Sequence, residues 1–230
     1  MRFIDTISQW DIELLLALNG SESLYLDGIM WTITRTSTWL LLFGALFYIV
    51  IRNNKLKQSL VIFILVALLI TVADQVASGI CKPLFQRFRP THDPIVGPMI
   101  DIVNGYRGGK YGFFSSHASN TFAGATFFAL LFRNIRVSVL LYIWATLCTY
   151  SRLYLGVHYP TDILTGLTFG IFSGYVFHFL YAYVGKRYFC QTSLNTTSSY
   201  AKQDFLVFYA AFALSCIYIL IRALWYADSF

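Results

Sequence analysis

The chain has 230 residues, of which 57% are hydrophobic and only 12% are charged, and its mean hydropathy is +0.60. Soluble domains carry about twice that charged fraction. The composition therefore excludes an ordinary soluble domain and indicates a membrane protein with several helices of about 17 to 25 residues, the length that crosses a bilayer. The net charge of +6 is spread over short loops, so no nucleic-acid partner is expected.

Residues 1–22 are expected to form a short helix in the membrane interface. Phe3, Ile7 and Trp10 recur at helical spacing with acidic residues between them, as in helices that lie along a bilayer surface. Acidic residues, Asp11 among them, also interrupt any apolar core that a cleaved signal peptide would need. We therefore predict that this segment is not such a peptide.

The remaining chain predicts an all-α polytopic membrane bundle with about six helices. No internal repeat or low-complexity linker divides the sequence, so residues 1–230 are expected to form one domain. The spans are expected at residues 24–51, 57–81, 118–133, 137–153, 161–185 and 204–226.

The longest polar connection, residues 82–117, is expected to be an external active-site loop. It is rich in Gly, Pro, Arg, Lys and Asp, and loops of this length in compact proteins are usually functional or disordered. With six spans, the basic residues after spans one, three and five share one side, which the positive-inside rule makes cytoplasmic. Residues 82–117 and 151–162 then share the other side, where their surplus of Lys and Arg needs a role.

Basic residues gather in Lys82–Pro90, which reads KPLFQRFRP. Three cations within eight residues at a membrane surface favour an anionic partner. The planar fork of Arg can bind two phosphate oxygens, and Lys adds a point charge. We interpret the stretch as a phosphate clamp, with a solvated basic loop or contacts with anionic lipids as the alternatives.

Ser115, Ser116 and His117 stand at the start of the third expected span. Ser is a favoured N-cap residue, and the unpaired N–H groups at a helix start bind phosphate readily. Plain capping is the alternative role for the two serines. His117 carries the side chain best able to exchange a proton near neutral pH.

Arg152, His158 and Asp162 flank the start of the fifth expected span. His158 and Asp162 are four residues apart, so on a helix they share a face. An Asp beside a His fixes the tautomer of the imidazole and stabilises its cation, although such a pair alone is also common as a structural feature. Together the three clusters supply the cations, the nucleophile and the proton donor that phosphoryl transfer without a metal needs.

These motifs resemble those of the type 2 phosphatidic acid phosphatase (PAP2) superfamily. Lys82 and Arg89, which a Pro follows, match its Lys, six residues, Arg-Pro pattern. Residues 151–162 match its Ser-Arg, five residues, His, three residues, Asp pattern without a gap. Where the family usually has Pro-Ser-Gly-His, this chain has Phe-Ser-Ser-His, so Phe114 and Ser116 depart from the pattern.

The resemblance covers about residues 10–185 and implies a PAP2/haloperoxidase-like helical core with a metal-independent phosphatase site. It implies that His158 attacks phosphorus to form a phosphohistidine, that Asp162 orients it, and that His117 protonates the leaving oxygen. No cofactor is implied, and the loop lacks a carboxylate cluster suited to Mg²⁺. The residues implied to bind the substrate phosphate are Lys82, Arg89, Ser115, Ser116 and Arg152.

Similarity to short bacterial members implies a membrane lipid phosphate or diphosphate as substrate, the inner membrane as location, and a site on the periplasmic face. Envelope lipids rank first, undecaprenyl diphosphate or lipid A, because the basic Gly-rich loop is similar to that of lipid A 4′-phosphatases. Phosphatidylglycerophosphate and phosphatidate are further candidates. The alternatives to a hydrolase are a lipid phosphotransferase with a non-water acceptor and a non-catalytic lipid-binding or transport protein. No obligate protein partner is evident.

Five further polar residues have roles that the sequence leaves open. Asp74, inside the second span, is interpreted as a structural partner of a site cation, with catalysis as the alternative. Arg35 is expected to snorkel outward or to contact a second phosphate. Arg87, Arg107 and Lys110 are candidates for contacts with a large head group.

Overall fold

The computed structural model describes residues 2–188 and 200–228, and its regular elements within these ranges are all helical, which confirms the all-α prediction. The helices are α1 (Arg2–Leu18), α2 (Leu24–Ile33), α3 (Leu40–Asn53), α4 (Leu56–Asp74), α5 (Lys82–Phe85), α6 (Ser116–Phe132), α7 (Ile135–Tyr154), α8 (Pro160–Tyr188) and α9 (Phe205–Ala227). The shorter turns are η1 (Thr36–Trp39), η2 (Gln75–Cys81, a π-helix), η3 (Pro90–His92), η4 (Gly97–Met99), η5 (Val103–Gly105) and η6 (Lys202–Asp204).

Large apolar side chains cover the outside of the bundle. Four stretches of the described residues are long and apolar enough to cross a membrane, namely Thr36–Asn53, Leu56–Phe85, Pro160–Tyr188 and Lys202–Ala227. On α4 every fourth residue presents an exposed apolar side chain, which forms a stripe along the helix. Exposed apolar surface on this scale fits lipid rather than water, so the chain is an integral membrane protein. The stripe consists of Leu56, Leu60, Ile64, Leu68 and Val72.

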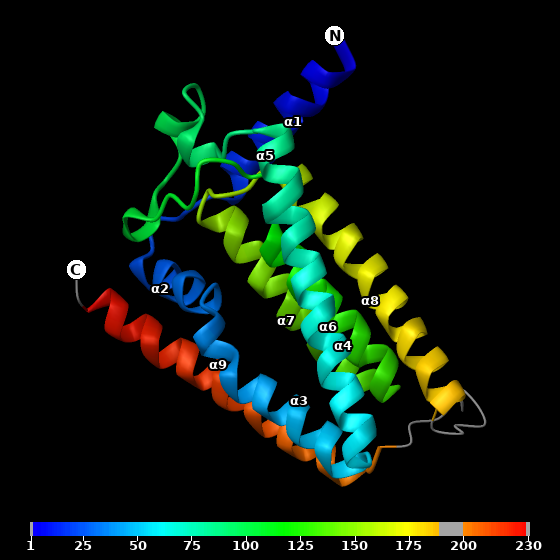
Figure 1. Cartoon of the computed structure of the whole chain (residues 1–230). Coiled ribbons are helices and arrows are strands. Elements are labelled where there is room, and N and C mark those ends of the chain that lie inside the picture. Colours follow the sequence, from blue (N-terminus) through cyan, green and yellow to red (C-terminus); the bar gives the residue numbers. More distant parts are fainter. Residues whose placement is uncertain (1, 189–199, 229–230) are drawn as a thin grey trace.

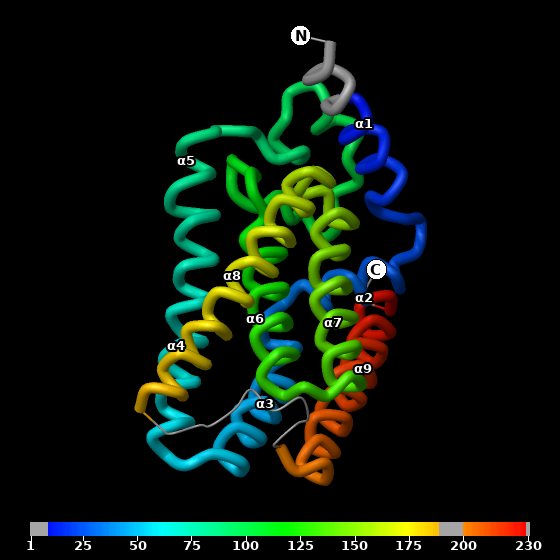
Figure 2. The backbone as a smooth tube through the Cα atoms, turned by 90° about the vertical axis from the view of Figure 1, so that its right-hand side faces the viewer, coloured from blue at the N-terminus to red at the C-terminus, as the bar shows by residue number. Residues whose placement is uncertain are grey.

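The expected third and fourth spans form as α6 and α7, but neither is among the four stretches, so the count of six spans is not confirmed. Figure 2 shows α6 between α4, α7 and α8. Ten of its 17 residues are buried. Because α6 contacts protein on several sides, its residues do not need the apolarity of a lipid-facing helix.

The expected first span, residues 24–51, is broken between α2 and α3. Two side chains after the break donate to carbonyls at the end of α2. The Thr38 hydroxyl donates to the Thr32 carbonyl (2.6 Å), and the Trp39 indole donates to the Ile33 carbonyl (2.9 Å). Both α2 and α3 pack along α9 (Figure 1). A break in the backbone is tolerated at this depth because protein groups pair with its carbonyls.

Three glycines allow α8 to lie close against α6. Gly166, Gly170 and Gly174 recur every fourth residue, so they share one face of α8. A side-chain carbon at Gly166 would lie 2.5 Å from the carbonyl oxygen of Ser115, and one at Gly174 would lie 2.8 Å from that of Ala123. Small residues at this spacing let membrane helices approach closely. The stripe therefore sets the distance between the starts of α6 and α8.

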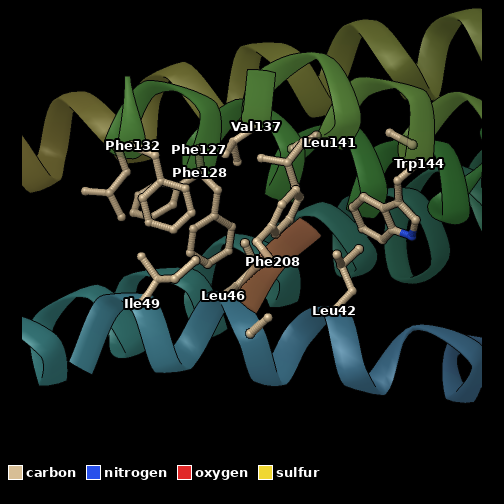
Figure 3. Packing of buried hydrophobic residues seen from close by; sticks show 14 of the residues in the cluster. Leu42, Leu46, Ile49, Phe127, Phe128, Phe132, Val137, Leu141, Trp144 and Phe208 are labelled. Atoms are coloured by element: carbon tan, nitrogen blue, oxygen red, sulfur yellow. The ribbon is translucent and has the colours of Figure 1, made fainter. Parts of the chain in front are cut away.

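The hydrophobic core lies in the half of the bundle away from the polar connections. Figure 3 shows side chains of α3 facing those of α6 and α7 together with one aromatic ring of α9. These side chains repeat every three or four residues along each helix, which is the period that buries one helix face. The labelled core residues are Leu42, Leu46, Ile49, Phe127, Phe128, Phe132, Val137, Leu141, Trp144 and Phe208.

The polar connections gather at one end of the bundle. The connection from α5 to α6, the turn from α7 to α8, and α1 lie together at the top of Figures 1 and 2. The α3–α4 and α6–α7 turns lie at the opposite end. Residues 82–117 and 151–162 therefore share one end, as expected. The helices extend further into the first segment than expected, since α5 ends at Phe85 and α6 begins at Ser116.

Candidate active site

The connection 86–115 folds back on itself and brings two arginines to the start of α8. The backbone N–H of Arg89 donates to the Lys110 carbonyl (3.0 Å), and that of Gly112 donates to the Arg87 carbonyl (2.9 Å). In an extended segment, residues two apart point to the same side. Both guanidinium groups consequently face α8.

Asp162 is held at the third position of α8. Its Oδ2 accepts the backbone N–H of Tyr159 (3.0 Å), as the acidic residue of a capping box does. Its Oδ1 accepts from Nη1 of Arg87 (2.8 Å). The backbone carbonyl of Asp162 accepts from the N–H of Ser115 (3.1 Å), which links the start of α8 to the start of α6. Two hydrogen bonds therefore fix the buried carboxylate, and a third fixes the backbone of the same residue.

His158 lies between Arg89 and Asp162 and is 1% exposed. Its Nε2 is 3.3 Å from Nη1 of Arg89, and its Nδ1 is 3.5 Å from Oδ2 of Asp162. A guanidinium group can only donate, so Nε2 must accept and carries the lone pair. The proton of the neutral imidazole is then on Nδ1, which faces the carboxylate. This tautomer leaves Nε2 as the nucleophilic atom.

Three cations surround the two histidines. Arg89, Arg152 and Lys82 all act on the charge of His158, and His117 is close enough to do so as well. Burial, followed by these charges, lowers the pKa of His158 well below its usual value. The imidazole is therefore neutral at physiological pH, as a nitrogen nucleophile has to be.

Arg89 and Arg152 are buried with more positive charge than negative charge around them. Burial and the charge of Arg152 lower the pKa of Arg89 to about 10, so Arg89 remains charged at neutral pH. Arg152 donates to the Thr34 hydroxyl (2.7 Å) and the Tyr106 hydroxyl (3.1 Å), while its buried Nε meets no hydrogen-bond partner in the part of the chain that the structure describes. Crowded cations with an unused donor favour binding of an anion such as phosphate.

Lys82 connects the end of the long α4–α5 helix to the start of α6. Its Nζ donates to the hydroxyls of Ser78 (2.8 Å) and Ser116 (3.3 Å). Asp74 lies close enough to attract the ammonium group but forms no hydrogen bond among the described residues. The π-helical turn η2 lies between Asp74 and Lys82.

The start of α6 carries the other predicted site residues. The Ser115 hydroxyl accepts the N–H of Ala118 (3.4 Å), so this serine is the N-cap of the helix. Phe114, in place of the usual Pro, is buried and packs its ring 5.4 Å from that of Phe169 on α8. Ser116, in place of the usual Gly, offers its hydroxyl to Lys82. Both departures thus add contacts that tie α6 to its neighbours.

His117 is half-buried and shares its surroundings with His158. The backbone of Thr34 lies beside its ring, and the charges of Arg152, Arg89 and Lys82 act on it. Thr34 lies at the break between α2 and α3, and it also accepts the hydrogen bond from Arg152. Our sequence interpretation missed Thr34, although the run Thr-Arg-Thr-Ser-Thr inside an apolar stretch was a readable sign of a helix break.

Arg87, which the sequence offered as a candidate for head-group contacts, is engaged in contacts with other protein groups. Its guanidinium donates to Asp162 and Thr161 through Nη1 (2.8 and 2.7 Å) and to Asp11 through Nη2. It also stacks over the ring of Tyr159 at 4.2 Å. The sequence interpretation used Asp11 only as an acidic residue that argues against a signal peptide. In the structure it is a buried member of the ion-pair network of the candidate site.

Three other cations lie in exposed positions. Arg35 stacks over Trp31 (4.9 Å), Lys110 lies over the rings of two aromatic neighbours (5.5 Å each), and Arg107 donates to the Thr91 carbonyl (3.1 Å). Within the described ranges, no group of three His, Cys, Asp or Glu residues is placed to hold a metal ion.

Comparisons with known proteins agree with the motifs. The sequence model of the PAP2 superfamily matches residues 60–189. A lipid A 4′-phosphatase of Bacteroides thetaiotaomicron is 38% identical over 178 residues, which are 77% of this chain and 79% of that protein. A lipid A 4′-phosphatase of Porphyromonas gingivalis is 35% identical over 185 residues, 80% of this chain and 78% of that protein. No solved structure matches the chain. The predicted resemblance is confirmed, and the chain belongs to the PAP2 superfamily.

Proposed function

We propose that the chain is a lipid A 4′-phosphatase that works through a phosphohistidine on His158. The single observation that carries the mechanism is the setting of this imidazole. Its Nε2 accepts from Arg89 within a group of cations, and its Nδ1 faces Asp162. A phosphate placed among the cations would meet a nitrogen lone pair on one side and a histidine, His117, able to act as an acid on the other.

In the first step, Nε2 of His158 attacks phosphorus and the bond to the lipid oxygen breaks. The electron pair of that bond goes to the leaving oxygen, which takes a proton from His117 to become a hydroxyl group. The phosphorylated imidazole keeps its proton on Nδ1 and is positively charged, and the carboxylate of Asp162 stabilises this charge. The bound phosphate's negative charge favours the protonated form of His117 before the step.

In the second step, His117 removes a proton from a water molecule whose oxygen attacks phosphorus. The phosphorus–nitrogen bond breaks, and its electron pair returns to Nε2 of His158. Lys82, Arg89 and Arg152 neutralise the oxygens of the transferring group in both steps, as preorganised cations do in phosphoryl transfer. Ser115, Ser116 and the open N–H groups at the start of α6 complete the phosphate site. Inorganic phosphate then leaves.

Two observations support a membrane lipid as substrate. The relatives named above are lipid A 4′-phosphatases. The site also lies at the end of a bundle whose outer helix faces are apolar, so a phosphate at head-group depth can enter while acyl chains stay in the bilayer. We place the enzyme in the bacterial inner membrane with the site on the periplasmic face, and treat residues 1–230 as one phosphatase domain.

Phosphate release by the detergent-purified protein, measured in excess EDTA, tests the proposal. The substrates are lipid A, undecaprenyl diphosphate, phosphatidate and phosphatidylglycerophosphate, with His158→Ala as the matched inactive variant. We expect fastest release from lipid A, at the 4′ position, and none from the variant. Faster release from another lipid would overturn the substrate, and loss of activity in EDTA would overturn the metal-free mechanism. Transfer to a lipid acceptor without free phosphate would identify a phosphotransferase, and no turnover of any lipid would favour a binding protein.

A further inference from the structure

Asp11 is a buried carboxylate that the phosphohistidine mechanism does not use. It lies on α1, is 1% exposed, and is distant in sequence from every other site residue. Its Oδ1 accepts the backbone N–H of Thr161 (2.9 Å), and its Oδ2 accepts from the Thr161 hydroxyl and from Nη2 of Arg87. A charged side chain this deeply buried is retained only where its partners satisfy it.

The first of these contacts caps α8 from outside the helix. The residue before α8 is Tyr159, whose side chain cannot accept the N–H groups at the helix start as Ser or Asp would. Asp11 supplies the missing acceptor to Thr161, the second residue of α8. Asp11 on α1 therefore contacts the backbone of α8 one position before Asp162.

The second contact divides one arginine between two carboxylates. Arg87 gives Nη1 to Asp162 (2.8 Å) and Nη2 to Asp11, so its two outer nitrogens point at different acids. The charges of Arg87, Asp162 and Asp11 add to −1. If Asp11 were neutral, the planar fork of Arg87 would be free to pair with both oxygens of Asp162. The charges of these three residues would then add to zero.

We propose that Asp11 is a positioning residue. It holds one half of the Arg87 guanidinium away from Asp162 and thereby keeps a net negative charge on the Nδ1 side of His158. This inference rests on the proposed phosphohistidine mechanism, in which the imidazole becomes positively charged. The charge appears only after phosphorus is attacked, so an interaction with it stabilises the transition state more than the bound substrate. Asp11 therefore affects the rate constant for turnover rather than substrate binding.

Four proteins test the inference: Asp11→Asn, Arg87→Gln, the double variant, and Glu13→Gln as a control. Glu13 lies on the same helix, carries the same charge and is exposed. We expect Asp11→Asn to lower kcat by about 10- to 100-fold with KM unchanged, the size usual for groups that orient a reacting side chain through another group. Glu13→Gln is expected to retain wild-type kcat.

The double variant separates a charge effect from a structural one. With Arg87 removed, Asp162 keeps its own charge, so the further change Asp11→Asn is expected to lower kcat by less than about threefold. If the Asp11→Asn single variant does not fold, the double variant is compared with Arg87→Gln alone, and a further fall in kcat of about tenfold or more would overturn the inference. Equal losses from Asp11→Asn in both backgrounds, or a rise in KM without a fall in kcat, would overturn the inference. No phosphate release by wild type and Glu13→Gln would instead overturn the proposed function beneath it.

Discussion

The starts of α8 and α6 each bring one histidine to the site, but the two helix ends are held differently. At α8, side chains from α1 and from the 86–115 connection fix Asp162 and Thr161, and His158 is almost fully buried. At α6, the cap is the helix's own Ser115, and His117 is half-buried. Side chains from two other elements thus hold the start of α8, while the start of α6 is held by its own cap, by Lys82 and by close packing against α8.

The difference matches the two chemical roles that we propose. A nucleophile has to hold one atom in line with phosphorus, and misplacement by about 1 Å can cost about 100-fold in rate. A proton donor has to act first on a leaving oxygen and later on water, so it faces two positions. The helix end held by two other elements carries the proposed nucleophile, and the more accessible end carries the proposed acid and base.

The largest effect is expected from replacing the two histidines in turn. His158→Ala should reduce lipid phosphate release to background, because it removes the attacking atom. His117→Ala should lower kcat by about 10²- to 10⁴-fold, the usual contribution of general acid catalysis. Steady-state phosphate release from lipid A measures both variants.

An activated substrate sharpens the distinction between the two histidines. The leaving group of p-nitrophenyl phosphate departs without a proton, so the first step should survive in His117→Ala, seen as a burst of p-nitrophenol. His158→Ala should give no burst. The same response of both variants to lipid A and to the aryl phosphate would contradict the assigned roles.

The next largest effect concerns the glycine stripe that joins the two helix ends. A methyl group at Gly166 would lie 2.5 Å from the Ser115 carbonyl oxygen, so Gly166→Ala should push the start of α6 away from α8. We expect a loss of about 1 to 3 kcal/mol in stability, as for other overpacked sites, and a fall in kcat of about 100-fold. Thermal unfolding in detergent and phosphate release measure the two effects.

Gly124→Ala on α6 is the matched control, because a side-chain carbon there meets nothing within 4 Å. This control should keep the wild-type rate and gain slightly in helix stability. If Gly166→Ala behaved like the control, the close approach of α6 and α8 would not determine the geometry of the site.

A smaller effect concerns the pKa of His158. Burial and the cations Arg89, Arg152 and Lys82 lower this pKa, so the imidazole should remain neutral when the pH falls from 7.5 to 6.5, where an ordinary His becomes half protonated. Arg152→Gln removes one cation and should raise the pKa towards its usual value. The protonated fraction at pH 6.5 should then be larger in the variant, as measured by nitrogen NMR of labelled histidine in substrate-free protein.

Assignment of the signal by its loss in His158→Ala provides the control for that titration. An imidazole of His158 that titrates near 6.5 in the wild-type protein would show that the cations do not act on it. A pKa that falls further in Arg152→Gln would reverse the expected sign.

The smallest effect is expected at Ser116. Ser116→Gly restores the usual family residue and removes the hydroxyl that accepts from Lys82 (3.3 Å). One hydrogen bond contributes about 1 kcal/mol net, so KM should change by no more than about fivefold and kcat should stay unchanged. Lys82→Met, which removes the cation itself, should raise KM far more. A larger loss in Ser116→Gly than in Lys82→Met would assign the serine a role that this geometry does not explain.

Much of the site could be predicted because its residues lie close together in sequence. His158 and Asp162 are four residues apart at the start of α8, and Ser115 and His117 stand at the start of α6. Local rules for helix starts therefore predicted where these four residues lie. The ion pairs of Arg87 were not predicted, because its partner Asp11 is 76 residues away. Thr34 was missed because 118 residues separate it from Arg152. Pairings over such distances depend on helix packing, which no local pattern specifies.

The fold could be predicted in class and only in part in detail. Apolar length located the continuous helix Leu56–Phe85, α8 and α9 within a few residues. The first expected span hid a break, because the run of Thr and Ser lay inside otherwise apolar sequence. The predicted count of six spans is not confirmed, because α6 and α7 are not among the four candidate spans. Helices packed within protein lack the strong apolarity of lipid-facing ones. The glycine stripe at 166–174 was readable as a packing motif, and our sequence interpretation did not use it.

The most direct test of the central claim is to trap the phosphorylated protein. Lipid A labelled with ³²P at the 4′ phosphate would be mixed with the detergent-solubilised enzyme in EDTA and quenched within one turnover. We predict a protein-bound label that is stable in base, labile in acid and absent from His158→Ala, because a phosphorus–nitrogen bond has formed at that residue. A label that survives acid, or one that persists in His158→Ala, would contradict the assignment of His158 as the nucleophile.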